Sequence, residues 1–324
     1  MRNAPLILLA GPTAVGKSEI ALCLAEKLNG EIVSVDSMQV YRGLDVGAAK
    51  PTPNERERIR HHLIDLVDLT HSFDAAQFAR LAHSAVNEIR ARGRVPILCG
   101  GTGFYFKVFL HGIGEAPPAA ATLRSQLEAT PLSELLAELA ANDPKTFERI
   151  DKQNPRRVIR AVEVLRLTGK PCSEQRASWT TRMAQPGDTI STALLTHLFI
   201  GLSRSSADLQ RRINQRVDKM FANGLVAETE KLLQQGLAEN QTAMQALGYR
   251  QVVEHLRGIH SLPATIELVK IRTRQFAKRQ MTWFKKYGPS HWINLSIQRA
   301  LDSTPDETIR RLYRELSDCT HASA

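Results

Sequence analysis

The chain has 324 residues, of which 43% are hydrophobic and 23% charged, a composition that excludes a disordered or fibrous protein and is typical of a globular one. Lysine and arginine total 43 against 33 acidic residues, which gives a formal net charge of +10. This excess favours a polyanionic partner such as nucleic acid, with a solvated basic surface or small anionic ligands as the alternatives.

Cysteine use and hydropathy indicate the compartment. The four cysteines are Cys23, Cys99, Cys172 and Cys319, and they lie too far apart for a zinc knuckle or a C-x-x-C motif. The first apolar run, residues 6–10, is too short for a signal peptide. No apolar stretch approaches the roughly 20 residues that a membrane helix needs. We therefore expect a soluble, cytoplasmic protein without a membrane partner.

The first hundred residues alternate between strand-like and helix-like patterns. Three short segments are strand candidates, at residues 6–10, 31–35 and 96–99, and the first is an uncharged apolar run as expected for a strand buried on both faces. Two segments with apolar residues at helical spacing predict helices. They span 18–28, which ends at Asn29-Gly30, and 73–92, which ends at Gly93. Repetition of strand, glycine turn and helix predicts an α/β fold with a doubly wound parallel sheet.

The pattern changes near residue 115. The sequence EAPPAAA at 115–121 predicts a linker. Residues 121–168 have helical character, with breaks at Pro131, Pro144 and Asn154-Pro155. The QPGDT sequence at 185–189 predicts another loop. Together these features predict a helical insertion.

An apolar run then predicts that the chain returns to the sheet. Residues 194–202 form a strand candidate, 207–235 and 262–286 are helical, and we expect a peripheral extension after Pro289. The predicted organisation has three segments: the first part of the core at 1–114, the insertion at 115–190, and the second part of the core with basic C-terminal helices at 191–324.

A glycine-rich loop carries the strongest single motif. It fits G-x-x-x-x-G-K-[ST] in every position and comprises Gly11, Pro12, Thr13, Ala14, Val15, Gly16, Lys17 and Ser18. Glycines let backbone amides curl around a phosphate. Lys17 is expected to neutralise phosphate oxygens and the Ser18 hydroxyl to bind Mg²⁺. The loop predicts a diphosphate or triphosphate ligand, but it does not specify hydrolysis.

A second metal ligand is not fixed by the pattern. Asp36, Asp65 and Asp68 each follow or interrupt an apolar run and are the candidates. The adjacent His61 and His62 have no third ligand at a suitable spacing, so we predict a structural role for both.

Several further segments are more specific in combination. They are DSMQVYRGLDVGAAKP at 36–51, HHLIDLVD at 61–68, PILCGGTGFY at 96–105, NPRRVIRAVEVLRLTGK at 154–170, ALGYRQ at 246–251 and QFAKRQMTWFKK at 275–286. With the loop at 11–18 they resemble, in order and over nearly 280 residues, the bacterial tRNA dimethylallyltransferases, also called tRNA isopentenyltransferases.

The resemblance implies both a fold and a reaction. The implied fold is a P-loop, nucleotide-kinase-like parallel sheet core with a helical insertion domain, and a channel that the two substrates enter from opposite ends. The implied substrates are dimethylallyl diphosphate and the anticodon stem-loop of a tRNA. The implied products are isopentenyladenosine at tRNA position 37 and diphosphate, with Mg²⁺ as the cofactor. We expect a monomer.

The resemblance also assigns residues at the reacting centre. It implies that Asp36 is the base that orients the adenine amine, where the residue pattern alone would leave an Asx-turn or a helix cap open. It implies that Thr102, at the end of a strand, lies in the channel near the reacting atoms, although a turn threonine is the alternative. Arg212 is the expected diphosphate contact from the second half of the core. Gln39 has an amide able to bind an adenine edge.

The expected tRNA contacts are more numerous and are spread along the chain. They include the segment 36–39, the insertion, the loop near 248 and the helix at 270–286, which carries seven cations and no acid. The residues are Asp36, Ser37, Met38, Gln39, Thr102, Arg124, Arg156, Arg157, Arg160, Gln245, Gly248, Tyr249, Arg250, Lys278, Arg279, Gln280, Trp283 and Lys285. Phe276 and Phe284 are expected to be partly buried.

The chain departs from the family pattern at two places. Gln245 stands where the family usually has a basic residue. Ser205 and Ser206 stand near the position of a family arginine, so that either Arg204 substitutes for it or a diphosphate or tRNA contact is missing.

Three other classes of function remain compatible with the phosphate loop. One is a small-molecule kinase or NTPase that binds ATP, and another is an isopentenyltransferase acting on free adenine nucleotides. The third is an RNA-binding protein with a degenerate loop, which an intact Lys17-Ser18 pair disfavours.

Overall fold

The computed structural model describes residues 5–112, 117, 120–175 and 197–295. The chain divides into two compact units, one formed by residues 1–110 and 192–324 and the other by residues 111–191. No helix in the described part of the chain is long and apolar enough to cross a bilayer.

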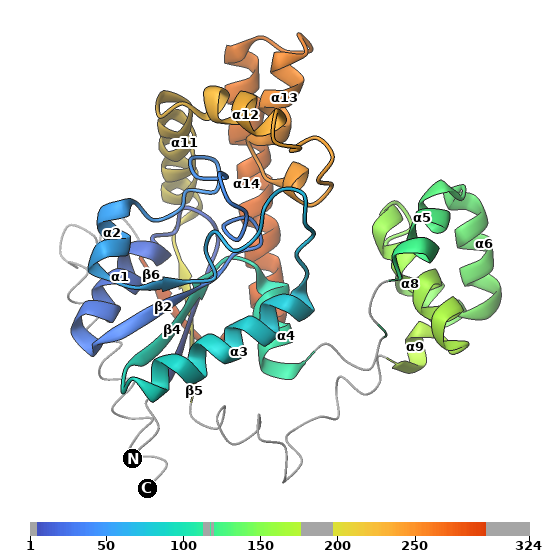
Figure 1. Ribbon diagram of the computed structural model, residues 1–324, viewed down its shortest axis with the longest axis horizontal. Helices are drawn as coiled ribbons and strands as arrows, with labels where there is room; N and C mark the ends of the chain where they lie inside the picture. Colours follow the sequence, from blue (N-terminus) through green and yellow to red (C-terminus); the bar gives the residue numbers. More distant parts are fainter. Residues whose placement is uncertain (1–4, 113–116, 118–119, 176–196, 296–324) are drawn as a thin grey trace, which may run out of the picture. The chain divides into compact units, whose positions relative to one another are not determined.

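The first unit is built on a six-stranded parallel sheet (Figure 1). Its strand order is β3-β2-β4-β1-β5-β6, and every neighbouring pair is parallel. The strands are β1 (Leu6–Ala10), β2 (Gly30–Val35), β3 (His61–His62), β4 (Val95–Gly100), β5 (His197–Ser203) and β6 (His291–Asn294). Because β1 lies centrally, between β4 and β5, the loop that follows it opens at the middle of the sheet.

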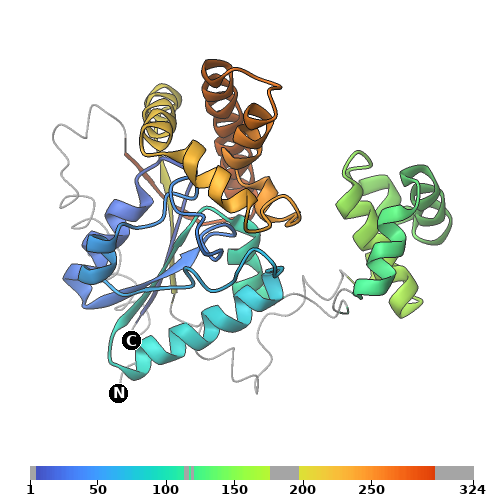
Figure 2. The ribbon, with the colours of Figure 1, turned by 45° about the horizontal axis from the view of Figure 1, so that its top comes forward.

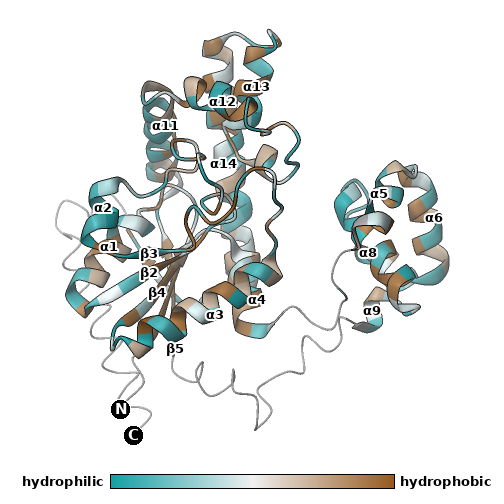
Figure 3. Ribbon diagram, in the orientation of Figure 1, coloured by the Kyte–Doolittle hydropathy of each residue, from teal (hydrophilic) through white to brown (hydrophobic). Residues whose placement is uncertain are grey.

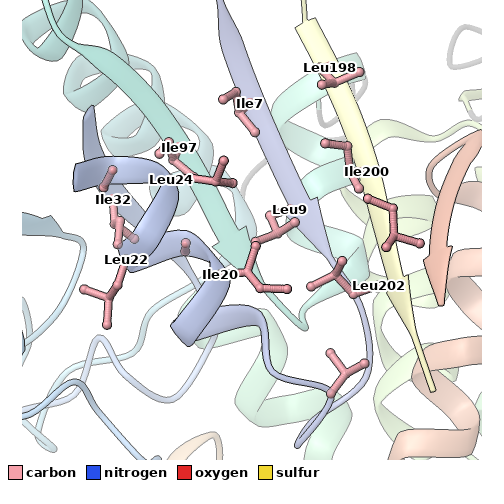
Figure 4. Close-up of a cluster of buried hydrophobic side chains, with 14 of the residues drawn as sticks. Ile7, Leu9, Ile20, Leu22, Leu24, Ile32, Ile97, Leu198, Ile200 and Leu202 are labelled. Atoms are coloured by element: carbon pink, nitrogen blue, oxygen red, sulfur yellow. The ribbon is translucent and has the colours of Figure 1, made fainter. Parts of the chain in front are cut away.

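The central strands are apolar because helices and loops cover both of their faces. All five residues of β1 are fully buried. On one face the helix α1 (Lys17–Leu28) packs Ile20 and Leu24 against Ile7, Leu9 and neighbouring aliphatic residues of β4 and β5 (Figure 4). Each such buried side chain contributes about 1.5–3 kcal/mol relative to an exposed one. Figure 3 shows the strands of the sheet mostly hydrophobic and the outer helix α11 mostly hydrophilic.

The helices of this unit begin and end at residues suited to those positions. They are α2 (Pro53–Arg58), α3 (Ala75–Ala91), α4 (Gly103–His111), α11 (Ser206–Ala222), α12 (Leu225–Leu233), α13 (Tyr249–Leu256) and α14 (Leu262–Tyr287). Asp74 and Gln77 form a capping box at the start of α3. Asn29 adopts a left-handed conformation after α1, as expected for a C-terminal cap.

The helices α11 and α14 lie side by side at the end of the sheet that carries the phosphate loop (Figures 1 and 2). Lys270 of α14 pairs with Asp218 of α11 at 2.8 Å, and Arg274 donates to Asn214 at 2.8 Å. Val217 and Val269 pack in the apolar seam between the two helices. These contacts fix the orientation of the two faces that later line the site.

The second unit is helical. It contains α5 (Ala121–Ala129), α6 (Leu132–Asn142), α7 (Pro144–Arg149), α8 (Pro155–Thr168) and α9 (Cys172–Gln175). Prolines stand at the first position of α7 and of α8, where their missing N–H costs nothing. Leu127, Leu135 and Leu139 pack with Val158 and Val162 of α8 in a separate apolar core.

Most of the expected elements are present within one or two residues of their predicted ends. The segment at 207–235 is two helices, because Gly224, with φ 91°, starts α12 after a turn. The expectation of a peripheral segment after Pro289 is wrong for residues 291–294, which form the edge strand β6 against β5 with Ile293 buried. The loop at 185–189, most of the linker at 115–121 and residues 194–196 lie outside the described residues.

Candidate active site

The phosphate loop connects β1 to α1 at the carboxyl edge of the sheet. Gly16 has φ 108°, a conformation that favours glycine. A β-carbon on Gly11 would lie 2.7 Å from the carbonyl oxygen of Leu202, so only glycine fits this close approach to β5. The Lys17 ammonium donates to the carbonyl of Pro12 at 2.8 Å, which folds its side chain back over the loop.

Two arginines brace the loop from the side of β5 and α11. The Nε atom of Arg204 donates to the carbonyl of Val15 at 2.7 Å, and Nε of Arg212 donates to that of Ala14 at 2.9 Å. Arg204 also pairs with the buried Asp208 at 2.8 Å, so it is held in place. The carbonyls of Ala14 and Val15 are thus occupied by arginines.

Lys17 lies among groups that change its basicity. Burial, the largest cause, and the charge of the nearby Arg216 lower the pKa of Lys17 to about 8, with Cys99 and Asp36 opposing the shift. An arriving diphosphate would favour the charged ammonium and raise the pKa again.

Arg216 is a site residue that the sequence analysis missed. It lies one helical turn after Arg212 on α11, and both line the large cavity beside the loop. Burial lowers the pKa of the Arg216 guanidinium, and the charge of Asp36 opposes that shift. The available signal was the spacing of four residues from Arg212, which places two arginines on one face of a helix.

Two adjoining cavities surround these groups. The larger, of about 1310 Å³, lies beside Gly16, Lys17 and Ser18 and has Arg42, Arg56, Arg58, Arg212, Arg216 and Lys219 in its wall. The smaller, of about 110 Å³, is lined by Thr13, Lys17, Ser18, Asp36, Cys99, Arg216 and Gln280, among others. Because Lys17, Ser18 and Arg216 line both, the phosphate loop stands at their junction.

Asp36 directly follows β2 and lines the small cavity. Its Oδ1 accepts hydrogen bonds from the amides of Met38 at 2.8 Å and Gln39 at 3.4 Å. The Asx-turn alternative is therefore present in the structure. Among the described residues, no hydrogen bond involves Oδ2, so one oxygen holds the turn and the other is available to a ligand.

Thr102 lies next to this turn, and its place near the reacting atoms stays a prediction. Its Oγ1 accepts a hydrogen bond from the amide of Ser37 at 3.2 Å, and its own amide donates to the carbonyl of Val35 at 3.2 Å. The ends of β2 and β4 are therefore joined beside Asp36. Thr102 keeps its hydroxyl proton for a further acceptor in this arrangement.

The Gln39 amide is bound within the protein. Its Oε1 accepts from the Ser34 hydroxyl at 2.7 Å, and its Nε2 donates to the carbonyls of Ala48 and Ala49 at 3.3 Å. This geometry does not support the prediction that Gln39 binds an adenine edge. Instead, Gln39 closes the small cavity by holding the 48–49 segment against β2.

The 245–250 segment divides into exposed and buried residues. Gln245 and Arg250 are exposed, and Arg250 pairs with Glu254 at 3.1 Å. Tyr249 is fully buried, and its hydroxyl donates to Glu228 at 2.6 Å and accepts from the amide of Gly47 at 3.1 Å. Burial likewise does not support direct RNA contact for Tyr249 or the buried Gly248, which follow the turn into α13.

The basic helix α14 has a solvent face and a core face. Lys278, Arg279 and Lys285 are exposed, while Phe284 is buried and Phe276 half-buried, as expected. Gln280 is buried and faces the small cavity. Trp283 covers Gly103, where an added β-carbon would lie 2.2 Å from the indole, so its ring packs on the start of α4.

The arginines of the helical unit also divide into two groups. Arg156 and Arg157 are exposed in the first turn of α8. Arg160 pairs with the fully buried Glu163 at 2.6 Å, and Arg124 lies 3.8 Å from the same carboxylate. Arg160 and Arg124 therefore stabilise this unit. An RNA phosphate would have to compete with Glu163 for either of them.

The structure shows which of the candidate metal ligands Asp36, Asp65 and Asp68 have other partners. Within the described residues, no group of three or more His, Cys, Asp or Glu side chains could hold a metal. Asp65 pairs with Arg56 at 2.6 Å and also with Lys50, and Asp68 pairs with Arg42 at 2.8 Å. The Ser18 hydroxyl and the Asp36 carboxylate line one cavity, and such oxygen donors together with phosphate fit Mg²⁺.

The neighbouring histidines have structural partners. His62 Nε2 lies 2.6 Å from the carboxylate of Glu31, and His61 Nδ1 lies 2.8 Å from the carbonyl of Ile59. Both interactions agree with the structural role predicted for them.

Comparison with known proteins places the chain in a family. A family model described as IPP transferase matches residues 39–287. The chain belongs to this family. A tRNA dimethylallyltransferase of Geobacter sulfurreducens is 43% identical over 89% of this chain and 91% of its own length. One from Geobacillus thermodenitrificans is 42% identical over 96% of this chain and 97% of its own length.

Solved structures extend the family comparison to the fold. The tRNA isopentenylpyrophosphate transferase of Bacillus halodurans is 36% identical, with a TM-score of 0.69 over 98% of this chain and 99% of that one. A eukaryotic dimethylallyltransferase acting on tRNA is 27% identical, with a TM-score of 0.78 over 94% of this chain and 77% of that one. The resemblance inferred from the motifs and the α/β fold are thereby confirmed.

Proposed function

We propose that this enzyme transfers the dimethylallyl group of dimethylallyl diphosphate to the exocyclic amine of the adenosine at tRNA position 37, giving isopentenyladenosine and diphosphate. The observation that carries the proposal is that cations for a diphosphate, Lys17 and Arg216, and a carboxylate for an acceptor, Asp36, line one small cavity. A transfer in which diphosphate leaves needs cations that stabilise the diphosphate close to a base that binds the amine.

The donor diphosphate is held at the junction of the two cavities. The backbone amides at the start of α1 and the ammonium of Lys17 can donate to an anion at this position. Arg212 and Arg216 neutralise further oxygens from α11. Mg²⁺ bound by Ser18 and the diphosphate would supply additional charge neutralisation to the leaving group.

Asp36 acts on the acceptor. An aromatic amine is a weak nucleophile, and the Oδ2 atom of Asp36 accepts a hydrogen bond from it and orients it. The nitrogen forms a bond to the allylic carbon while the bond between that carbon and the diphosphate oxygen breaks. The electron pair of the broken bond leaves with diphosphate, and the excess proton on nitrogen passes to Asp36 and then to solvent.

The cations near the loop accelerate the step by binding charge that develops during it. The bridging oxygen becomes more negative as the carbon–oxygen bond lengthens, so Lys17 and Arg216 bind the transition state more tightly than the ground state. The hydroxyl proton of Thr102 is not used in the hydrogen bond with Ser37. Thr102 therefore donates it in a hydrogen bond to dimethylallyl diphosphate or to the adenine amine beside Asp36.

The RNA binds through exposed cations. Lys278, Arg279 and Lys285 of α14 lie on the solvent face of that helix, and Arg156 and Arg157 lie on that of α8. Cations of this kind neutralise phosphates and set affinity without selecting a sequence. The target base must leave its stack to reach Asp36, at a cost that is small in a loop.

A competition assay separates this function from its alternatives. The protein is incubated with Mg²⁺ and labelled dimethylallyl diphosphate in the presence of an anticodon stem-loop, AMP, or neither, and ATP hydrolysis is followed in parallel. We expect label on the stem-loop alone. Label on AMP would support an enzyme acting on free nucleotides, and ATP turnover without label transfer would support a kinase or NTPase.

A further inference from the structure

Gln280 connects the phosphate loop, which binds the donor in the proposed function, to the turn beside the acceptor. It lies on α14 and is only 8% exposed. Its Oε1 accepts a hydrogen bond from the backbone amide of Thr13, at 2.8 Å, in the phosphate loop. Its Nε2 donates to the carbonyl of Gly101, at 2.9 Å, in the turn that precedes Thr102.

The orientation of this amide is fixed by its partners. A backbone N–H can only donate and a carbonyl can only accept, so one orientation of the Gln280 amide satisfies both. No other standard side chain of this length offers an acceptor and a donor at its end. Glutamate keeps the acceptor but places a second oxygen against the Gly101 carbonyl.

Gly101 is shaped for the approach of this side chain. A β-carbon at Gly101 would lie 2.4 Å from the Gln280 Nε2 atom. Because that atom is the end of a side chain, an alanine at 101 would displace the amide rather than the backbone. The same link can therefore be broken from either end.

The two linked loops carry different reactants in the function proposed above. The phosphate loop holds the donor through Lys17 and Ser18. The 101–102 turn leads to Thr102, which is bonded to Ser37 beside Asp36. Gln280 also takes up the Thr13 amide, which removes that amide from the set predicted to bind diphosphate.

We propose that Gln280 is a positioning residue that sets the separation between the donor loop and the acceptor turn, rather than a residue that binds tRNA. This inference rests on the proposed function. Rates of group transfer fall steeply when reacting atoms are misplaced by about 1 Å, by up to roughly a hundredfold. A link of two hydrogen bonds between buried loops is suited to prevent such a displacement.

The test compares two matched substitutions on one helix. Gln280→Met retains the length of the side chain without either hydrogen bond, and Gln275→Met makes the same change at an exposed position of α14. We expect Gln280→Met to lower kcat by about ten- to a hundredfold per folded molecule. The Kd for inorganic diphosphate and the KM for the stem-loop should each stay within about threefold, and Gln275→Met should resemble the wild type.

A second variant tests the link from its other end. Gly101→Ala should lower kcat as Gln280→Met does, and the double variant should be little worse than either single one, because both break the same link. Gln280→Glu should not restore the rate. Independent losses that multiply in the double variant would contradict the proposal.

The fate of the donor gives a further readout that a loss of stability would not change. If the two loops separate, water reaches the allylic carbon, and dimethylallyl alcohol and diphosphate form instead of modified RNA. We expect the ratio of hydrolysis to transfer to rise in Gln280→Met. An unchanged kcat, or a rise confined to the KM for RNA, would overturn the inference, whereas absence of transfer by the wild type would overturn the proposed function itself.

Discussion

The hydroxyl of Thr102 accepts a hydrogen bond from the backbone amide of Ser37 at 3.2 Å, one residue from Asp36. The end of β4 is thereby fastened to the end of β2, and the carboxylate of Asp36 is held between them. A carboxylate on a mobile loop would change orientation whenever the loop moved, whereas Asp36 is fixed by its own turn and by Thr102. Because Oδ1 holds the turn and Oδ2 acts on the acceptor, substitutions can test the two oxygens separately.

Two substitutions at Asp36 separate the base from the turn. Asp36→Asn keeps an oxygen to accept from the amides of Met38 and Gln39 but loses the charge, and Asp36→Ala loses both. We expect both variants to lower kcat by about 10²–10⁴-fold with diphosphate affinity nearly unchanged. Only Asp36→Ala should also lower the free energy of unfolding, by about 1 kcal/mol. Turnover of Asp36→Asn near that of the wild type would remove the carboxylate from the mechanism.

Arg216 is expected to bind diphosphate. Gln replaces its charge with a neutral amide, so Arg216→Gln should raise the Kd for diphosphate by about ten- to a hundredfold. Arg211→Gln is the matched control on α11, because Arg211 is exposed and its partner Asp208 keeps Arg204. Isothermal titration of both variants decides the point, and equal affinities would place Arg216 outside the donor site.

The pH dependence of diphosphate binding should report Lys17. Burial lowers the pKa of Lys17 to about 8, so the free enzyme loses the ammonium as the pH rises through that value. The ligand is dimethylallyl diphosphate, whose terminal phosphate completes its ionisation near pH 6, so the ligand charge is constant above about pH 7. The Kd should therefore rise by about tenfold between pH 7 and 9. Lys17→Arg, which stays charged, should show no such rise.

The exposed cations of α14 should govern the salt dependence of RNA binding. Lys278→Gln is expected to weaken binding to any stem-loop and to reduce the slope of log Kd against log salt by about one unit. Lys270→Gln changes a lysine of the same helix that is paired with Asp218 and Glu267, and it should leave the slope unchanged. A slope altered equally by both would indicate an effect on the helix rather than on a phosphate contact.

Tyr249 should affect stability and not RNA affinity. Tyr249→Phe removes the hydroxyl between Glu228 and Gly47, and we expect the free energy of unfolding to fall by about 1–2 kcal/mol. Burial and the Glu228 carboxylate both raise the pKa of this phenol, so its hydroxyl stays protonated at neutral pH. Denaturant titration and RNA binding are measured together. A lower RNA affinity at unchanged stability would restore the contact predicted from the sequence.

The sequence predicted the elements whose signals are local. The predicted helix breaks at Pro131, Pro144 and Asn154-Pro155 coincide with the starts of α6, α7 and α8. Proline and capping residues act on their immediate neighbours, so such breaks are visible in the sequence. The phosphate loop was predicted for the same reason, because its glycines, lysine and serine lie within eight consecutive residues.

The features that the sequence did not predict depend on distant contacts. The edge strand β6 is four residues long and is stabilised by β5, some ninety residues earlier in the chain. The burial of Tyr249 requires Glu228 and Gly47, and the position of Gln280 requires Thr13 and Gly101. No local pattern encodes these pairings. For Arg216 the one local signal is its spacing of four residues from Arg212 on α11.

The most direct test of the account follows one nucleotide. An unmodified anticodon stem-loop with three consecutive adenosines is incubated with the wild-type enzyme, Mg²⁺ and dimethylallyl diphosphate, then digested and sequenced by mass spectrometry. We expect one dimethylallyl group, on the adenosine directly 3′ of the anticodon, and loss of the product when that adenosine is replaced. Modification spread over several adenosines, or none at all with diphosphate still bound, would contradict the account.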